Sequence, residues 1–396
     1  MAILSTRRIT MRPALLIAAC GFLLHAAAWG SEPASIPPPL DRHVREAMAN
    51  AQVQGLALAV IDEGKVAYTA SWGVRNAARQ PLTTDTVMYG ASLTKMVFAY
   101  TVMQLVEERK LGLDGSIAQH LPKPLPEYAN EAGYGPWQHL AGDERWRKLT
   151  PRILLTHSPG FANFAFVEPD GKLRFHFDPG SRYAYSGEGL ILLQFVLERA
   201  LGMQVGAEMQ RRVFERFGMK NTSMTWRPDF AANLADGWNA EGKPEAHDER
   251  SRVRAAGSMD TTINDMALFA AGFMRGEGLH PASRAEMLRA QLPITTATQF
   301  PTFQPELPPA RRHPGLAAGL GLITFSGPQG AGFFKGGHND TTGNMLVCLE
   351  KKRRCVVLLA NDVRAEALFP GIVKRVLGET GMPWTWEYGA NAGLEK

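Results

Sequence analysis

The sequence predicts a mixed α+β fold (α/β mixed), in which an antiparallel β-sheet is flanked by helices and carries an inserted, mainly helical lobe. Three observations predict this class. A helix and a strand hairpin open the folded part of the chain, apolar helical runs follow, and the C-terminal third returns through strand-like segments. With 396 residues, 45% of them hydrophobic, the chain can form one large domain or two lobes around a shared cleft.

The first predicted elements are a helix near Asp41–Ala51 and a hairpin through Gly55–Gly73. The run Met96–Glu108 is apolar on nearly every face, which predicts a buried helix. This helix begins the helical lobe, which we expect over roughly residues 92–250. The proline-rich stretch Gln299–Pro314 is expected to border the cleft between the lobe and the sheet.

The C-terminal third is predicted to supply most of the sheet. Its strand-like segments are apolar and are separated by turn residues, as in an antiparallel meander. A helix near Ala365–Leu377 follows the last strand. The predicted strands are Gly319–Phe325, Gly332–Gly336, Asn344–Leu349 and Cys355–Ala360.

The N-terminus is typical of an export signal. Arginines at positions 7, 8 and 12 precede an apolar stretch over 14–24, and small residues follow up to Gly30. The apolar stretch is too short for a stable membrane span. We therefore expect a signal peptide in residues 1–30, a flexible leader in 31–40, one folded domain in 41–390, and a periplasmic or secreted protein.

Two alternatives remain for this segment. Met11, instead of Met1, is an alternative start. Ile17–Cys20 also fits a lipoprotein cleavage box, with anchoring at Cys20, although the apolar run continues past that cysteine.

Charge and composition indicate a small-molecule substrate more than a macromolecular partner. Three of the five net positive charges come from the N-terminal arginines, so a chain beginning near Ser31 carries +2. The distribution of basic residues does not predict a nucleic-acid-binding surface, and the basic run Lys351–Arg354 is interpreted as a solvated hairpin loop. No metal-ligand spacing appears, we expect no cofactor, and scattered histidines such as His157 are interpreted as structural. The sequence carries no signal for an oligomeric state.

Ser92-Leu93-Thr94-Lys95 places a hydroxyl and an amine one helical turn apart. A serine needs a neighbouring base to become a nucleophile at neutral pH. An amine can be that base only where burial or a second cation keeps it neutral. The alternative is a serine N-cap on an ordinary helix, with Lys95 extended to solvent.

Two further segments supply complementary chemistry. Tyr185 follows a Pro-Gly turn and precedes the apolar helical run Leu190–Leu201, so its phenol is placed at a helix N-terminus, where it can accept or relay a proton. Lys335-Gly336-Gly337 ends a strand with a cation and an edge free of side chains, against which a substrate backbone can lie. The alternatives are a packing aromatic and a plain hairpin with an exposed lysine.

Cys348 and Cys355 lie in two predicted strands joined by a short charged turn. A tight hairpin places them opposite each other, and export permits a disulfide. The alternative is a pair of packed free thiols.

With these motifs, the chain resembles the serine beta-lactamase and penicillin-binding peptidase family, in particular its class C branch and the related esterases. The resemblance runs from about Val53 to Asn361 and implies a beta-lactamase/transpeptidase-like fold. The landmarks that follow the family's order are Gly55–Val60, Leu111–Asp114, Leu154–Gly160, Phe217–Thr222 and Ala255–Met259.

The resemblance implies a role for each motif. Ser92 resembles the acylated nucleophile, Lys95 its general base, and Tyr185 the proton shuttle of a Tyr-x-Asn box. Lys335 would keep Lys95 and Tyr185 in their less protonated forms and attract a substrate carboxylate. The backbone N–H groups of Ser92 and His338 would form the oxyanion hole.

Two departures from the family pattern decide the expected substrate. Gly187 stands where the box has asparagine, and Gly336 stands where Lys-Thr-Gly has threonine. Both losses weaken recognition of a penicillin or an acyl-D-Ala-D-Ala peptide more than ester hydrolysis. We expect an exported serine hydrolase acting on an ester or small amide. The alternatives are a beta-lactamase or D-alanyl-D-alanine carboxypeptidase acting on peptidoglycan-derived substrates, and a non-catalytic protein that senses peptidoglycan.

Overall fold

The computed structural model describes residues 1–2, 36–129 and 134–389. The elements below all belong to one compact unit, Pro33–Lys396. The expected signal peptide, including Cys20, lies almost wholly outside the described residues. The first helix, α1, spans Pro38–Asn50 and so begins within the segment expected to be a leader. Two prolines occupy its first turn, where their missing N–H groups cost no intrahelical hydrogen bond.

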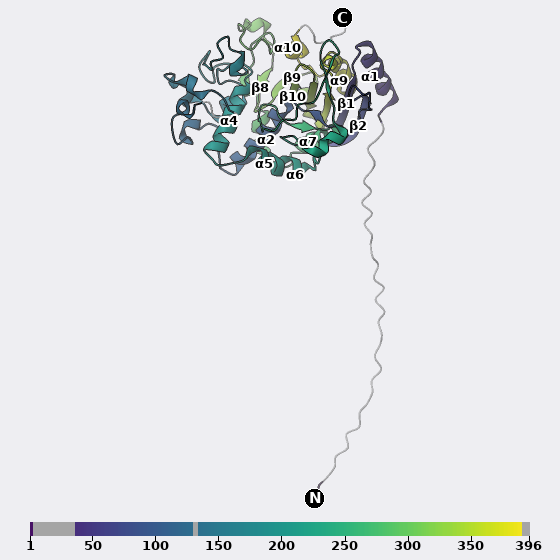
Figure 1. The fold of residues 1–396 in the computed structure, drawn as a ribbon, viewed down its shortest axis with the longest axis horizontal. Helices are drawn as coiled ribbons and strands as arrows, with labels where there is room; N and C mark the ends of the chain where they lie inside the picture. Colours follow the sequence, from purple (N-terminus) through teal and green to yellow (C-terminus); the bar gives the residue numbers. More distant parts are fainter. Residues whose placement is uncertain (3–35, 130–133, 390–396) are drawn as a thin grey trace. The chain divides into compact units, whose positions relative to one another are not determined.

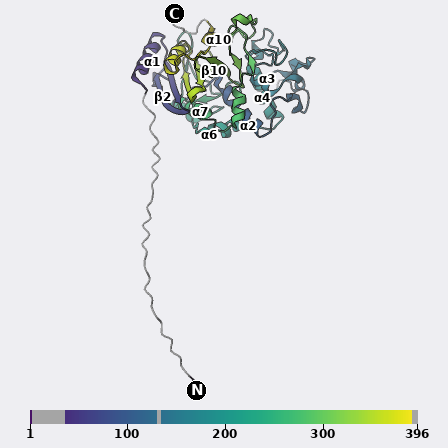
Figure 2. The ribbon, with the colours of Figure 1, turned by 180° about the vertical axis from the view of Figure 1, so that it is seen from behind.

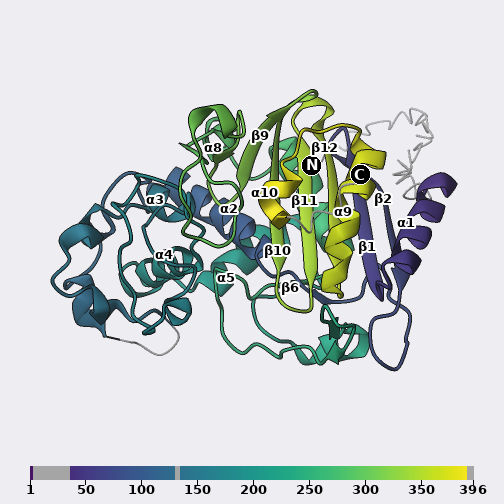
Figure 3. The same cartoon turned by 90° about the horizontal axis from the view of Figure 1, so that it is seen from above.

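The sheet has the predicted antiparallel arrangement. Its strand order is β2-β1-β12-β11-β10-β9-β8-β7, so the N-terminal hairpin pairs with the last strand of the chain. Figure 3 shows the longer strands side by side, with α9 (Phe369–Leu377) across them. The strands are β1 Gly55–Asp62, β2 Lys65–Gly73, β7 Leu292–Pro293, β8 Ala317–Ala318, β9 Ile323–Gly327, β10 Gly330–His338, β11 Gly343–Leu349 and β12 Arg354–Ala360.

The strand predicted from Gly319 begins four residues later, at Ile323. The intervening residues turn the chain between β8 and β9, and the backbone N–H of Gly319 donates to the carbonyl of Leu322 at 2.9 Å. Gly321 has a φ of +74°, a conformation that glycine adopts without strain. The first half of this apolar run, which holds two glycines, therefore forms a turn and not a continuous strand.

Alternate residues of the sheet pack against two different helical layers. In β1, Ala57 and Ala59 belong to the apolar cluster that includes α2 and α7, whereas Leu56 and Leu58 belong to the cluster that includes α1 and α9. Helices α2 (Leu93–Glu107) and α7 (Ile263–Arg275) lie on the side of the sheet opposite α9 (Figures 1 and 2). The sheet is thus buried on both faces.

Helix α2 is the centre of the molecule's packing. Every residue from Leu93 to Leu105 is buried, as the apolar run predicted.

The predicted lobe is less regular than expected, because 3₁₀ turns and loops connect its helices. Among the described residues, no helix has both the length and the apolar character to cross a membrane. The remaining elements are β3 Met88–Tyr89, α3 Pro151–Leu155, α4 Gly187–Arg199, α5 Val205–Met209, α6 Glu215–Phe217, β4 Gly237–Trp238, β5 Pro244–Glu245, β6 Asp260–Thr261, α8 Pro281–Leu288 and α10 Trp384–Tyr388.

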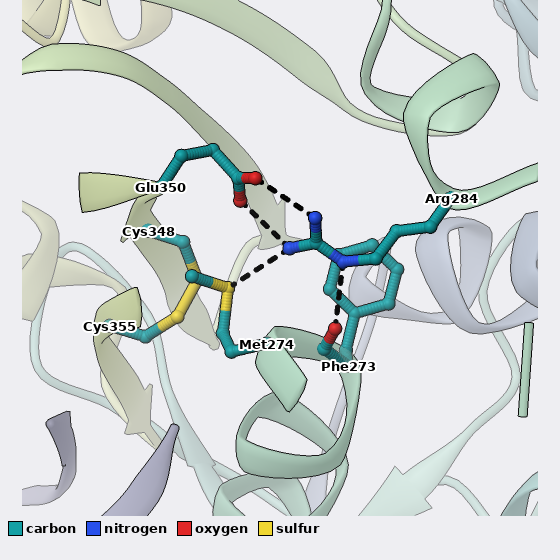
Figure 4. The surroundings of a disulfide bond; sticks show 6 residues. All are labelled: Phe273, Met274, Arg284, Cys348, Glu350 and Cys355. Carbon is teal, nitrogen blue, oxygen red and sulfur yellow. Dashed lines mark hydrogen bonds and ion pairs between the residues drawn. A yellow bond between two sulfur atoms is a disulfide. The ribbon is translucent and has the colours of Figure 1, made fainter. Parts of the chain in front are cut away.

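A disulfide joins Cys348 of β11 to Cys355 of β12, which face each other in register (Figure 4). Next to it, Arg284 donates to both carboxylate oxygens of Glu350, at 2.9 and 2.8 Å, and to the carbonyl of Phe273 at 2.9 Å. The bridge therefore links two strands within the apolar layer against α7, with an ion pair in its surroundings.

Candidate active site

Ser92 lies at the N-cap position of α2, but its side chain makes no capping hydrogen bond. Its Oγ instead accepts hydrogen bonds from Lys95 Nζ and from the Tyr185 hydroxyl, both at 2.8 Å. The preceding residue, Ala91, has a φ of +46°, a strained conformation for a residue with a Cβ. The hydroxyl is thus held by two proton-carrying groups, which a structural N-cap would not require.

Lys95 is 1% exposed, because the chain buries the first turn of α2 beneath the lobe. Its Nζ donates to Ser92 Oγ and also to the carbonyl oxygen of Ala256. Burial holds the pKa of Lys95 well below its usual range, and the nearby cation Lys335 lowers it further. Both causes favour the neutral amine, which is the form that can accept a proton.

Tyr185 is buried among groups that orient its ring. Its ring stacks on His157 with centroids 4.4 Å apart, and Lys95 Nζ and Lys335 Nζ lie 5.0 and 5.2 Å from its centroid. Burial raises the pKa of Tyr185, and its hydrogen bond to Ser92 lowers it only in part. Burial therefore favours the protonated phenol, which runs against the expectation that Lys335 holds Tyr185 in a less protonated form. The charges of Glu387 and Tyr89 raise the pKa of Tyr185 further.

The strand β10 brings Lys335 and two glycines to the nucleophile. Lys335 is 4% exposed, its Nζ donates to the carbonyl of Gly336 at 2.7 Å, and burial lowers its pKa to about 8. A Cβ at Gly337 would lie 2.9 Å from the backbone nitrogens of Ser92 and Leu93. The end of β10 thus packs closely against the start of α2, and only glycine fits at position 337.

His338 follows these glycines at the end of β10. Its Nδ1 lies 3.0 Å from a carboxylate oxygen of Glu366, and this contact raises the pKa of the imidazole.

These residues share one pocket of about 850 Å³. Ser92, Lys95, Tyr185 and Lys335 lie on its wall, so the structure brings together the four side chains that the sequence singled out. Aromatic side chains from the lobe and from the proline-rich stretch form apolar parts of the wall. They are Phe164, Phe166 and Phe300.

The sequence did not indicate Asn163, which occupies the region next to Gly187. The backbone N–H of Gly187 donates to Asn163 Oδ1 at 2.9 Å. A Cβ on Gly187 would lie 2.6 Å from two ring carbons of Phe164. The structure therefore places Asn163, from a different segment, next to position 187, where the family motif has asparagine. An asparagine at position 187 would collide with Phe164, so that substitution is not expected to increase acylation by beta-lactams.

Glu387 is a second residue that the sequence did not indicate. It comes from α10, is 8% exposed, and lines the pocket. A Cβ on Gly336 would lie 2.0 Å from its Oε1. The sequence marked the missing threonine at position 336, but no local pattern identified Glu387 as the residue that lies there.

Ionisable side chains of both signs line the pocket, and burial favours their neutral forms. Burial raises the pKa of the carboxyls of Glu188 and Glu387 and lowers the pKa of Lys335 and Arg254. Two acids, Glu188 and Glu387, and three strong bases, Lys95, Lys335 and Arg254, thus line the same cavity. Among the described residues, no group of three His, Cys, Asp or Glu side chains is arranged to hold a metal ion.

The chain is similar to known proteins over most of its length. A family model described as beta-lactamase matches residues 40–373. Lovastatin esterase of Penicillium rubens is 27% identical over 225 residues, covering 50% of this chain and 56% of that protein. Esterase EstB of Burkholderia gladioli is 27% identical over 214 residues, covering 50% and 54%. The chain thus spans little more than half the length of these relatives.

A structural neighbour covers more of the chain. D-alanine carboxypeptidase AmpC from Burkholderia cenocepacia superposes with a TM-score of 0.65 at 19% identity, over 86% of this chain and 97% of that one. This likeness confirms the beta-lactamase/transpeptidase-like fold. Since the family model spans most of the chain, the protein belongs to the beta-lactamase family.

Proposed function

We propose that the protein is an esterase, or a hydrolase of small amides, that acts through an acyl-enzyme on Ser92. The observation that carries this proposal is the pair of 2.8 Å hydrogen bonds from Lys95 and Tyr185 to Ser92 Oγ. A serine held by a buried amine and a phenol has both a base for its own proton and an acid for the leaving group.

In the acylation step, Ser92 Oγ attacks the ester carbonyl carbon while its proton passes to Lys95 Nζ. The carbonyl oxygen becomes an oxyanion, to which the backbone N–H groups of Ser92 and His338 would donate. When the tetrahedral intermediate collapses, Tyr185 gives its proton to the leaving alkoxide, which departs as an alcohol. Tyr185 then recovers a proton from protonated Lys95.

Deacylation reverses these roles. A water molecule gives a proton to Lys95 and attacks the acyl carbon, and the bond to Ser92 Oγ breaks. Ser92 Oγ takes the proton back, and the carboxylic acid leaves. One ester and one water thus give one acid and one alcohol, and the three side chains return to their starting states.

The pocket supports an uncharged ester as the substrate. Its aromatic wall favours an apolar group, and Glu188 and Glu387 line the same cavity as its basic side chains. Two of the relatives found in the comparison are esterases by name.

A second candidate is a beta-lactamase or a D-alanyl-D-alanine carboxypeptidase. Lys335 favours it, because a buried cation on β10 can attract a substrate carboxylate. Glu387 opposes it, because its carboxylate lies beside the same segment of β10. A non-catalytic sensor of peptidoglycan would have no use for a base and an acid both bonded to Ser92.

Intact-mass spectrometry tests the proposal directly. The native protein is incubated with p-nitrophenyl butyrate, a fluorescent penicillin and a fluorophosphonate, alongside Ser92→Ala and, as a control, Ser251→Ala, which changes an exposed serine. We expect ester turnover and fluorophosphonate labelling in the native protein and the control, and neither in Ser92→Ala. Labelling that persists in Ser92→Ala would contradict the assignment, and efficient penicillin hydrolysis without ester turnover would favour the second candidate.

We also propose that the protein is exported. The arginines, apolar stretch and small residues of positions 7–30 support a cleaved signal, and the bond between Cys348 and Cys355 is of a kind that persists in oxidising compartments. Expression of the full chain in a Gram-negative host, followed by fractionation and N-terminal sequencing, is expected to give a periplasmic or secreted protein beginning near Ser31. An uncleaved cytoplasmic chain would contradict export, and a lipid-modified N-terminus at Cys20 would show anchoring.

A further inference from the structure

The carboxylate of Glu387 lies directly against Gly336 of β10. Glu387 Oε1 occupies the position where any side chain on residue 336 would begin, 2.0 Å from an ideal Cβ there. Because both residues line the pocket that holds Ser92, the carboxylate takes the place of a side chain on the β10 edge. Only a glycine at position 336 therefore leaves room for the Glu387 carboxylate.

The carboxylate is held in position by a second segment. Gln299 Nε2 donates to Glu387 Oε2 at 2.8 Å, and the backbone N–H of Gln299 donates to the carbonyl of Trp386 at 2.7 Å. The hydroxyl of Tyr183 in turn donates to Gln299 Oε1 at 3.2 Å. These contacts fix α10 against the proline-rich stretch, so Glu387 is preorganised and not a mobile surface acid.

Two basic side chains near Gly336, His338 and Lys335, are each influenced by an acid. His338 Nδ1 lies 3.0 Å from Glu366 Oε1. Lys335 stands next to Gly336 on β10, and Glu387 is the acid whose charge acts on it most strongly. With Glu366 and Glu387 present, a substrate carboxylate at this point would meet like charge, and Glu387 is buried.

We propose that Glu387 is the specificity-determining residue of this pocket, excluding substrates that carry a carboxylate beside Gly336 and favouring those with a neutral or cationic group there. The inference rests on the proposed function, since it names the substrate class of the same site. It makes the native substrate a neutral or amine-bearing ester, in contrast to the carboxylate-bearing substrates that Lys335 alone would favour.

The test compares p-nitrophenyl esters that differ in charge at one end: heptanoate (neutral), adipate with its second carboxylate free (anionic), and 6-(trimethylammonio)hexanoate (cationic). A second series places the same charges on the alcohol of phenyl acetates. Values of kcat/KM are measured for the native enzyme, Glu387→Gln, Glu387→Asp and, as a control, Glu379→Gln, which neutralises an exposed carboxylate.

In one series or the other, the native enzyme is expected to prefer the neutral and cationic esters to the anionic one by at least about tenfold. Glu387→Gln is expected to raise the anionic-to-neutral ratio of kcat/KM about tenfold and to lower the cationic-to-neutral ratio by a similar factor. Glu387→Asp is expected to keep the native order, and Glu379→Gln is expected to behave as the native enzyme.

A native enzyme that hydrolyses anionic and neutral esters equally well in both series would overturn the inference, whether or not Glu387→Gln folds. Unchanged ratios in a folded Glu387→Gln would also overturn it. In both cases ester turnover itself persists, so the proposed function stands. Absence of turnover of every ester by the native protein would overturn both proposals.

Discussion

The imidazole of His157 is stacked on the phenol of Tyr185, with centroids 4.4 Å apart and planes 22° from parallel. The backbone N–H of Ser186 donates to Nδ1 of His157 at 3.1 Å, and this hydrogen bond fixes the imidazole ring. Burial, together with the charges of Lys95 and Lys335, holds the pKa of His157 well below its usual range. Tyr185 therefore rests on a neutral ring, which orients its hydroxyl toward Ser92 without adding a further cation near Lys95.

Tyr185→Phe separates these two roles, because phenylalanine keeps the stacking on His157 but loses the hydroxyl. If the hydroxyl protonates the leaving group, kcat for p-nitrophenyl butyrate is expected to fall about 10²–10⁴-fold, with a small change in KM. Steady-state kinetics measure both. Tyr68→Phe, which changes a tyrosine on β2, serves as the control and is expected to keep native activity. Native kcat in Tyr185→Phe would remove the hydroxyl from the mechanism.

Lys95→Arg tests the general base. Arginine keeps a cation one turn from Ser92 but does not give up its proton near neutral pH, so ester turnover is expected to fall by about 10²–10⁴-fold. The measurement is kcat/KM for p-nitrophenyl butyrate, with circular dichroism to show that the buried site still folds. A folded Lys95→Arg protein with near-native turnover would show that another group is the base.

Lys335→Met tests the electrostatic link between the two lysines. Lys95 acts as a base only when it is unprotonated, so activity is present above its pKa and is lost as the pH falls through it. Removing the Lys335 charge is expected to raise the pKa of Lys95, so the acidic limb of the kcat/KM profile moves to higher pH.

The same variant also gives a prediction at alkaline pH. Lys335 has a pKa of about 8, so the native enzyme loses that charge above this pH, and there the two profiles are expected to converge in shape. Lys65→Met, on the exposed edge strand β2, is the control for a general loss of positive charge. An acidic limb that does not move would show that burial alone sets the pKa of Lys95.

Gly337→Ala tests the contact between β10 and the start of α2. A Cβ there would lie 2.9 Å from the backbone nitrogens of Ser92 and Leu93, so either the strand or the nucleophile must move. We expect at least about a 10²-fold loss of kcat/KM, since displacement of the reacting group by about 1 Å costs that much. Gly112→Ala is the matched control, because a Cβ at Gly112 meets no atom within 4 Å. Equal activity of the two variants would show that this close approach does not position Ser92.

The sequence alone determined the parts of the site that depend on local geometry. Ser92 and Lys95 are neighbours because residues three apart share one side of a helix, and the apolar run after them required that helix to be buried. The Lys335-Gly336-Gly337 segment was recognisable as a strand edge, and Cys348 and Cys355 face each other because a short turn fixes the hairpin register. These features need only short stretches of chain.

The tertiary structure decided which distant residues complete the site and how its groups ionise. Asn163 reaches Gly187 from 24 residues earlier, and Glu387 reaches Gly336 from 51 residues later. Neither pairing follows from periodicity or from a motif, because both depend on how the lobe and α10 pack against β10. The same packing raises the pKa of Tyr185, because the shift comes mainly from burial, and burial is a property of the whole fold.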